Sequence, residues 1–389
     1  MICFAGRDRP AVRHTPPAHN NGMDPSLFVN GLEWATMIES HRIIQPKKEE
    51  SIMNVTTLGI DLAKNVFHLH GVNRHGKTVL TKRVTRAKLR ETVANLPPCL
   101  IGMEACASSH YWARELGRLG HTVKLMAPQF VKPYVKSNKN DARDAESIGE
   151  AVARPHMRFV PAKAIEQQDI QAIHRIRERR VSARTALLNQ IRGLLAEYGL
   201  VIPLKRNAVR RALPRILEDA DNGLTALARE FVADLYEELQ ALGHAVGAYD
   251  AKIERLFKAN PVCQRLAKVE GVGPVTATAL VAAGDARAFQ NGRQMSAWLG
   301  LVPRQHGTGG KNVLLGISKR GDTYLRTLLI HGARAAVAAA KRKDDPRSRW
   351  INALAARRGA NIAAVALANK NARILWALMA HGEEYRKAA

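Results

Sequence analysis

The sequence has few cysteines, and none of them are spaced as the ligands of a metal site are. Its four cysteines, Cys3, Cys99, Cys106 and Cys263, form no CxxC motif and no zinc-ligand spacing. This usage indicates neither a disulfide scaffold nor a structural zinc site. It fits a protein of a reducing cytoplasm.

Long apolar runs are also absent. The apolar segment 374–379 is short and follows closely on Lys370 and Arg373. No stretch therefore has the length and apolarity of a membrane-spanning helix. A membrane is excluded as a partner, and we expect a soluble protein.

Acidic residues are scarce relative to basic ones. The 389 residues include 60 Lys and Arg against 34 Asp and Glu, which gives a formal net charge of +26 and a pI near 10.4. This surplus favours polyanionic partners, nucleic acid above all, without distinguishing DNA from RNA. With 46% hydrophobic and 24% charged residues, the chain is long enough for two or three domains with buried cores.

Residues 1–52 show no sustained periodicity and end with the stretch IQPKKEES shortly before Met53. We expect this segment to be a poorly ordered extension. An alternative is that translation starts at Met53, because residues 48–50 can be encoded by a purine-rich sequence resembling a bacterial ribosome-binding site. N-terminal sequencing of native protein that begins at Met1 would contradict this alternative.

Residues 53–160 have the pattern of an α/β domain. Segments 55–73 and 77–86, rich in β-branched residues, predict a meander of three strands. The pattern continues with a short amphipathic helix, a buried strand, a helix and another strand, over residues 87–96, 99–106, 109–120 and 121–128. This order is typical of a ribonuclease H-like fold. A further predicted helix then carries Asp141 and Asp144.

The segment 161–260 is predicted to be helical. Apolar residues follow a helical period over 169–199, and over 224–256 they step by threes and fours, close to a coiled-coil seam. The two helical patterns are separated by Pro203 and Pro214. We expect an antiparallel hairpin or a dimerisation arm, with a plain helical spacer as the alternative.

Residues 261–389 form the last predicted domain, which is mostly helical. Within it, Gly271-Val272-Gly273-Pro274 lies between two helical patterns. This is typical of a helix-hairpin-helix, whose glycine turn exposes backbone N–H groups to a phosphate. Gly271 and Gly273 are therefore candidate nucleic-acid-binding residues, and an ordinary glycine-containing connection between helices is the alternative.

Four acidic residues are candidates for a metal site. Asp61 and Glu104 each follow directly on a buried-strand pattern, and these strands are neighbours in a ribonuclease H-like sheet. Asp141 and Asp144 are three residues apart on a predicted helix and so share a face. Converging carboxylates repel one another, and Mg²⁺ or Mn²⁺ relieves that repulsion, so the set predicts a two-metal phosphoryl-transfer site. Taken singly, Asp141 could be only a helix N-cap, and Glu104 could simply begin a helix.

Six ordered motifs give the chain a resemblance to a known family. They are GIDLAKNVF, GMEACASSHYWARELGRLGH, KNDARDAESI, VEGVGPVTATAL, WLGLVPRQH and GISKRGDTYLRTLLIHGAR. From about Met53 to near the C-terminus, the chain closely resembles the insertion sequence 110 family of DEDD transposases, and more narrowly its insertion sequence 1111 branch. The resemblance does not cover residues 1–52.

The resemblance implies a three-part enzyme. Its RuvC-like N-terminal domain would contribute four acidic residues that match Asp61, Glu104, Asp141 and Asp144. A coiled-coil segment and a C-terminal transposase domain with a nucleophilic serine would follow. The enzyme would act as a homo-oligomer, a dimer or tetramer, in which domains of different subunits build composite active sites. A noncoding guide RNA of the element would pair with the DNA of the element ends and of the target.

The sequence departs from the family at the nucleophile. The family's serine lies shortly after a GLxPR stretch, here residues 300–304, and counting without gaps places Thr308 at that position. Members of the branch often carry a serine beside it, where this chain has Gly307. A threonine hydroxyl can attack phosphorus if a base takes its proton, although its methyl group hinders approach. Ser318 is the fallback nucleophile, and a flexible basic loop that only binds phosphate is the alternative.

Basic residues near these positions are candidates for contacting nucleic acid. Those around Thr308 that could hold phosphate charge are Arg304, His306, Lys311, Lys319 and Arg320. Lys136, Lys139 and Arg143 flank the two aspartates and would guide a strand toward them. Arg326 and Arg334, on a predicted helix, are expected to contact the nucleic-acid backbone rather than to do chemistry.

The main hypothesis from the sequence is an RNA-guided DNA transposase or recombinase that uses metal and a hydroxyl nucleophile. One alternative is a RuvC-like nuclease that uses water, with a C-terminal domain that only binds DNA. A third possibility, favoured by Gly307, is an inactivated transposase copy that still binds nucleic acid. A covalent protein–DNA adduct separates the first two, and loss of cleavage in Asp141→Ala would exclude the third.

Overall fold

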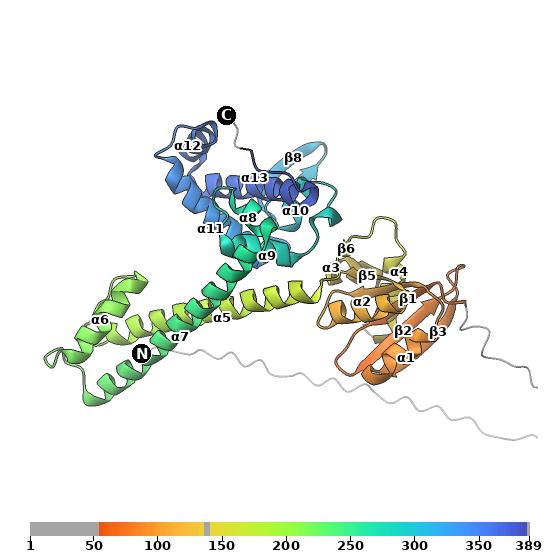
Figure 1. Cartoon of the computed structure of the whole chain (residues 1–389), viewed down its shortest axis with the longest axis horizontal. Coiled ribbons are helices and arrows are strands. Elements are labelled where there is room, and N and C mark those ends of the chain that lie inside the picture. Colours follow the sequence, from red (N-terminus) through yellow and green to blue (C-terminus); the bar gives the residue numbers. More distant parts are fainter. Residues whose placement is uncertain (1–53, 136–140, 387–389) are drawn as a thin grey trace, which may run out of the picture. The chain divides into compact units, whose positions relative to one another are not determined.

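The computed structural model of the protein describes residues 54–135 and 141–386. The extension predicted over residues 1–52 and the basic residues Lys136 and Lys139 lie outside the described residues. The described part begins with a mixed α/β region and continues into helical segments (Figure 1).

The N-terminal region is built on a six-stranded mixed sheet (Figure 1). Its strands are β1 Thr57–Asp61, β2 Val66–Val72, β3 Thr78–Thr85, β4 Leu100–Glu104, β5 Thr122–Met126 and β6 Phe159–Val160. They lie in the order β3-β2-β1-β4-β5-β6, with β1, β4 and β5 parallel and the remaining pairs antiparallel. The meander and the next two strands match the sequence prediction, which did not include β6. The sheet is consistent with the expected ribonuclease H-like order.

Helices cover both faces of this sheet. On one face, α1 (Leu89–Ala94) and α2 (Ser109–Arg118) bury their apolar residues against the sheet. On the other face, α4 (Asp141–Val152) packs with the short α3 (Pro128–Val131) over a second apolar cluster. Because both faces are covered, the central residues of β1 and β4 are buried whichever way they point.

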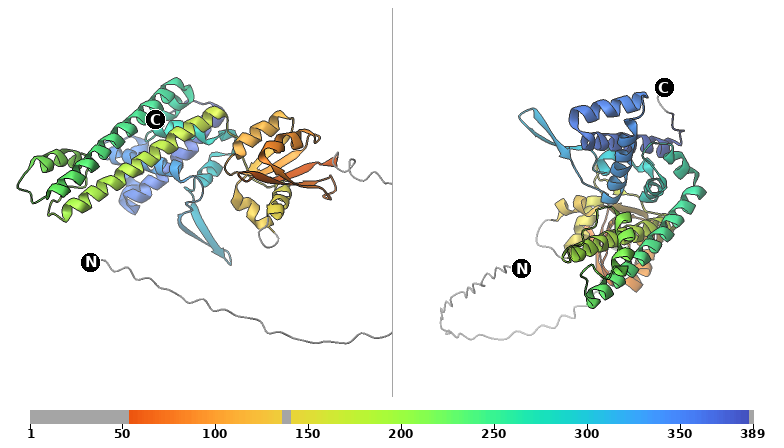
Figure 2. Two further views of the ribbon diagram at one scale, coloured as in Figure 1. Left: turned by 90° about the horizontal axis from the view of Figure 1, so that it is seen from below. Right: turned by 90° about the vertical axis from the view of Figure 1, so that its left-hand side faces the viewer.

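The middle segment contains an antiparallel pair of long helices. Its helices are α5 Ile165–Ala196, α6 Arg206–Glu218 and α7 Ala226–Ala259. Helices α5 and α7 lie side by side in each view (Figures 1 and 2). Arg177 on α5 pairs with Asp250 on α7, and Arg180 donates to the carbonyl of Ala245. Advancing along α5 therefore means going backward along α7, as in the antiparallel hairpin that the sequence suggests.

The sequence pattern did not predict helix α6. Pro214 lies inside this helix. In the sequence, Pro203 and Pro214 suggest only a connection between two long helices. The proline ring removes one helical hydrogen bond. Val209 and Leu213 are fully buried in the cluster shared with α5 and α7, and such packing supplies most of a short helix's stability. Tertiary burial here overrides the local signal.

The C-terminal region is mostly helical, as predicted, and shares one apolar core. Its helices are α8 Pro261–Ala267, α9 Pro274–Ala283, α10 Gly292–Trp298, α11 Thr323–Ala340, α12 Pro346–Arg358 and α13 Ala360–His381. Two strands, β7 Pro303–Thr308 and β8 Lys311–Ile317, form an antiparallel hairpin that projects from these helices (Figure 2). Among the described helices, none is long and apolar enough to cross a membrane.

Candidate active site

Two of the predicted carboxylates leave the sheet at the same edge. Strands β1 and β4 are parallel neighbours, with Ile60 opposite Met103, and Asp61 and Glu104 are their last residues. Both acidic residues are half-buried. The pKa of the Cys106 thiol is raised first by burial and then by the charges of Glu104 and Asp61. Both carboxylates therefore lie near enough to the Cys106 thiol for their charges to raise its pKa.

Helix α4 lies directly against the sheet because glycines leave room for it. Gly59 and Gly102 each stand two residues before a strand-end carboxylate and so on the same face as that carboxylate. A Cβ at Gly59 would lie 2.5 Å from the backbone nitrogen of Gly149 on α4, and one at Gly102 would lie 2.8 Å from the Cβ of Val152. The Gly-x-acid pattern of LGID and IGME carries this signal in the sequence, but the prediction of the site missed it.

Three of the four predicted carboxylates converge. Side-chain oxygens of Asp61, Asp141 and Asp144 all lie within 4.8 Å of one another. Asp61 and Asp144 are half-buried, and Asp141 is exposed. Both helix aspartates belong to the first turn of α4, where a helix favours negative charge. Among the described residues Glu104 is outside this group, so its participation stays a prediction.

A histidine on the neighbouring strand faces this cluster. His68 on β2 is in register with Asp61, and its Nδ1 lies 3.9 Å from a carboxylate oxygen of Asp141. This separation is too long for a hydrogen bond, but it places the imidazole within reach of the carboxylate charges. The sequence prediction did not include His68. The alternating histidines in VFHLHGV, on the strand that pairs with β1, are the signal that could have indicated it.

The donors of this cluster suit a hard divalent cation. Carboxylate oxygens are the ligands that Mg²⁺ and Mn²⁺ prefer. Oxygens bound to one Mg²⁺ at about 2.1 Å lie at most about 4.2 Å apart, so small side-chain movements would bring all three aspartates onto a single ion. A bound cation would also remove the repulsion between ionised carboxylates at this spacing. The residues present therefore fit a divalent metal.

The predicted nucleophile lies at the tip of the β7–β8 hairpin. Thr308 is exposed at the end of β7 and pairs with Lys311 at the start of β8. Between them, Gly309 and Gly310 have φ of +57° and +78°, a turn conformation that favours glycine. Strand alternation puts His306 on the same face as Thr308. These residues belong to a hairpin rather than to the flexible loop considered as the alternative.

Gly307 faces the side chain of Asn312 on the neighbouring strand. It pairs with Asn312 across the hairpin, and a Cβ at this position would lie 2.6 Å from the Asn312 Oδ1. A serine here would require the Asn312 side chain to move. Arg304, also on β7, is exposed. Asn312 is exposed, so the movement of its side chain is a small one, and the hairpin presents an exposed hydroxyl at position 308.

Lys319 and Arg320 are exposed on a tightly packed loop. Lys319 has a φ of +54°, and its N–H donates to the carbonyl of Gly300 at 3.1 Å. A Cβ at Gly300 would overlap the carbonyl oxygen of Arg320, and one at Gly321 would overlap that of Trp298. These contacts fix the backbone of the loop, from which the two exposed cations extend.

Arg326 is buried beneath this loop and does not face solvent. It is only 7% exposed, and its guanidinium donates to the carbonyl oxygens of Leu299 and Arg320 at 3.0 and 3.2 Å and to the hydroxyl of Thr323 at 3.0 Å. The predicted contact of Arg326 with nucleic acid is wrong, because helical periodicity does not reveal that a loop closes over this face. Arg334 on the same helix is exposed.

Ser318, the fallback nucleophile, is half-buried. Its backbone N–H donates to the carbonyl of Val302 at 2.8 Å. Its Oγ is buried and has no hydrogen-bond partner among the described residues. The geometry therefore favours Thr308 over Ser318 as a group that a DNA strand can reach.

The two glycines of the predicted helix-hairpin-helix differ in their surroundings. They lie in the turn between α8 and α9. Gly271 has a φ of +87°, and a Cβ there would lie 2.7 Å from the carbonyl oxygen of Gly332 on α11, so this glycine permits close packing. A Cβ at Gly273 would meet nothing within 4 Å. Gly273 leaves the start of α9 open, and phosphate binding by this turn stays a prediction.

Comparison with known families covers both halves of the chain. Residues 58–200 match a family model for DEDD transposases of IS110. Residues 263–349 match the model of the transposase IS116/IS110/IS902 family. The chain is also 54% identical over 336 residues to a probable family 20 transposase of Pseudomonas aeruginosa, which covers 86% of this chain and 99% of that protein. This chain belongs to the IS116/IS110/IS902 family of transposases.

Other transposases are similar over nearly their full lengths. The chain is 48% identical over 369 residues to the transposase for insertion sequence element IS1111A of Coxiella burnetii, covering 94% of this chain and 100% of that protein. It is 40% identical over 335 residues to the transposase for insertion sequence element IS1328 of Yersinia enterocolitica, covering 86% and 99%. The family resemblance of the six motifs is therefore confirmed. The DEDD region of this transposase includes the sheet and α4, and membership of the DEDD class implies dependence on a divalent metal.

Proposed function

We propose that this transposase cleaves and rejoins DNA strands at the ends of an insertion element, guided by a noncoding RNA of that element. The observation that carries the proposal is the convergence of three aspartates within the region that matches the DEDD model. A net charge of +26 suits a protein with two polyanionic partners. The printed names of its relatives associate them with the insertion elements IS1111A and IS1328.

The aspartate cluster would position the scissile phosphate. Asp61, Asp141 and Asp144 would hold Mg²⁺ or Mn²⁺, with Glu104 as the fourth carboxylate. When bound, the metal neutralises the phosphate and stabilises the charge that develops during phosphoryl transfer. Arg143, exposed on α4 beside the aspartates, guides the strand toward them.

Thr308 would act as the nucleophile. A bond forms between its Oγ and phosphorus while the bond between phosphorus and the leaving oxygen of the cut strand breaks, and the leaving oxygen gains a proton. The threonine proton passes to a base, for which His306 on the same hairpin face is the candidate. A hydroxyl of the incoming strand then attacks the ester, which restores Thr308 and joins the strands. The number of phosphodiester bonds is unchanged, so hydrolysis is not the outcome.

The three predicted segments would cooperate between subunits. We assign a RuvC-like domain to residues 53–160, a coiled-coil segment to 161–260 and a transposase domain to 261–389. In a dimer or tetramer the hairpin of one subunit would complete the carboxylate site of another. The hairpin also exposes three apolar side chains, Val313, Leu314 and Leu315, at 53%, 64% and 46%. Neighbouring exposed apolar residues of this kind favour burial against a partner.

The test is a search for a covalent protein–DNA adduct. The protein is incubated with Mg²⁺, labelled element-end DNA and RNA transcribed from the flank of the element, and the products are run on a denaturing gel. Wild type and Thr308→Ser should give a DNA band that stays attached to protein. Thr308→Val, which keeps the shape but lacks the hydroxyl, should lose it. Ser318→Ala is the matched control and should keep it.

Three results would count against parts of this proposal. DNA cleavage without any adduct would indicate a metal-dependent nuclease that uses water. An adduct that persists in Thr308→Val would exclude Thr308 as the nucleophile. Equal reaction at the correct site when the RNA is omitted would refute RNA guidance.

A further inference from the structure

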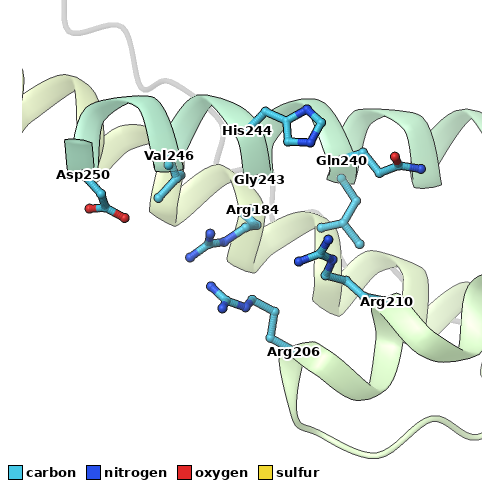
Figure 3. A pocket seen from close by; sticks show the side chains of 10 residues that line it. Arg184, Arg206, Arg210, Gln240, Gly243, His244, Val246 and Asp250 are labelled. Carbon is cyan, nitrogen blue, oxygen red and sulfur yellow. The ribbon is translucent and has the colours of Figure 1, made fainter. Parts of the chain in front are cut away.

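A basic pocket lies between the three helices of the middle segment, on residues to which the site above assigns no role. It encloses about 240 Å³. Arg184 from α5 and Arg206 and Arg210 from α6 reach into it, and Figure 3 shows their guanidinium groups approaching one another beside α7. The α7 side is lined by Leu239, Gln240, Gly243, His244, Val246, Gly247 and Asp250. The pocket therefore gathers three cations beside a helix face that includes two glycines.

The protein neutralises the positive charge in this pocket only in part. Among the residues that the structure describes, Arg184, Arg206 and Arg210 form no ion pair with a carboxylate. The one acidic residue at the pocket, Asp250, already pairs with Arg177 at 2.5 Å. Burial and the charge of Arg206 lower the pKa of the Arg184 guanidinium even though Asp250 raises it. Three arginines that share one pocket with a single carboxylate, itself paired with Arg177, favour a bound anion.

The start of α6 adds to this preference. Arg206 is the first residue of the helix, the preceding Lys205 provides no side-chain cap, and the first turn contains no acidic residue. A helix N-terminus carries partial positive charge and unpaired N–H groups. Placing arginine there costs stability in the free protein, and an anion would offset that cost.

The two glycines indicate that the space itself is used. Gly243 and Gly247 are one turn apart in the interior of α7, where each glycine costs about 1 kcal/mol relative to alanine. A Cβ at either position would meet nothing within 4 Å, so packing against a neighbour does not require these glycines. Their effect is to keep the pocket open.

We propose that this pocket binds a phosphate group of a nucleic-acid backbone. Guanidinium groups pair with phosphate oxygens through two parallel hydrogen bonds, which suits three arginines that converge. The pocket is also smaller than the roughly 300–1,000 Å³ typical of small-molecule sites, so it fits one phosphate better than a whole cofactor. The helical segment would thereby hold a strand of RNA or DNA at a point on the α5–α6–α7 hairpin. The proposal does not depend on the carboxylates or on Thr308.

The test measures binding by the full chain without divalent metal, so that failure of the cleavage chemistry cannot affect it. The probes are a labelled single-stranded RNA, the single-stranded DNA of the same sequence and the corresponding DNA duplex. Arg184→Gln and Arg210→Gln should each weaken binding of at least one probe about 10-fold. The slope of log affinity against log salt should become shallower by about 0.7 for a single strand or about 0.9 for a duplex.

Two further variants separate a binding role from a structural one. Arg211 is the exposed neighbour of Arg210 on α6 and bonds its own helix at the carbonyl of Asn207, so Arg211→Gln is the matched control and should bind normally. Gly243→Leu fills the pocket without changing charge, and it should weaken binding as the arginine variants do. The melting temperature of free Arg184→Gln should not fall, because the substitution relieves repulsion.

The outcomes are distinct. Loss confined to the RNA probe identifies RNA as the source of the phosphate, loss confined to DNA identifies DNA, and loss with all three identifies a site for the backbone they share. Unchanged affinity and salt slope for all three probes in Arg184→Gln, Arg210→Gln and Gly243→Leu would overturn the proposal. Equal weakening by Arg211→Gln would overturn it as well, since the pocket would then have no special role.

Discussion

Replacing Gly59 by alanine should damage the carboxylate cluster without touching a carboxylate. The added Cβ would lie 2.5 Å from the backbone nitrogen of Gly149 and would overlap the carbonyl oxygen of Ala145. Carbon atoms normally approach other heavy atoms to about 3.5 Å, so α4 would have to retreat by about 1 Å. Both obstructing atoms are backbone, and no side-chain rotation relieves the clash.

The expected effects follow from that displacement. Overpacking of this kind costs about 1–3 kcal/mol, and about 2 kcal/mol would lower the melting temperature by roughly 10 °C in a domain of about 100 residues. Metal ligands must hold their positions within about 0.5 Å, so moving Asp141 and Asp144 away from Asp61 should weaken Mn²⁺ binding by about 10-fold. Circular dichroism melting and Mn²⁺ titration calorimetry measure the two effects.

Two glycine variants serve as controls. Gly149→Ala addresses the same contact from the helix side, where the added Cβ would lie 3.4 Å from the nitrogen of Gly59, so it should be close to neutral. Gly117→Ala on α2 would meet nothing within 4 Å and should stabilise by about 0.5–1 kcal/mol, since glycine is unfavourable inside a helix. Normal melting and normal Mn²⁺ affinity in Gly59→Ala would refute the argument that this glycine positions α4.

Three further substitutions probe other parts of the structure. Arg326→Met should destabilise the protein by about 3 kcal/mol, measured by urea unfolding, because the buried carbonyl oxygens of Leu299 and Arg320 lose their donor. Ser318→Ala should be neutral or stabilise by up to about 1 kcal/mol in the same assay, because it removes a buried hydroxyl that has no hydrogen-bond partner among the described residues. Burial is the main cause that lowers the pKa of His174, on α5, from 6.5 to about 4. Between these two pH values the unfolded chain binds more protons than the folded one. The free energy of unfolding should therefore fall as the pH drops through this range, by up to about 3 kcal/mol. His174→Gln should reduce that pH dependence in unfolding curves, and an unchanged dependence would contradict the assignment.

Elements with one or two buried faces were predictable from the sequence. The strands that contain Asp61 and Glu104 have apolar residues buried on both faces, and α7 has an apolar stripe at helical spacing. The β7–β8 hairpin has no such signal, because nearly all of its residues are exposed. Helix α6 was missed for a different reason, since Pro214 indicates a break that burial against α5 and α7 overrides.

The candidate site divides in the same way. Asp61, Asp141 and Asp144 could be chosen because each stands at a recognisable end of a strand or start of a helix, and the motifs place them in a known family. For His68 the sequence offers only the alternating histidines of VFHLHGV, and its place beside the aspartates depends on the register between β1 and β2. The basic pocket was not predicted at all, since Arg184 and Arg206 meet only when α5 and α6 pack.

Amino-acid order alone indicated the family of this protein, its preference for polyanionic partners and the candidate carboxylates of its DEDD region, because charge, periodicity and motif spacing are properties of the chain itself. Tertiary structure decided which of these groups meet: the glycines that admit α4 to the sheet, the loop that buries Arg326 and the three arginines that share one pocket. The reason is that distances between residues remote in sequence depend on how helices and strands pack, which local patterns do not encode.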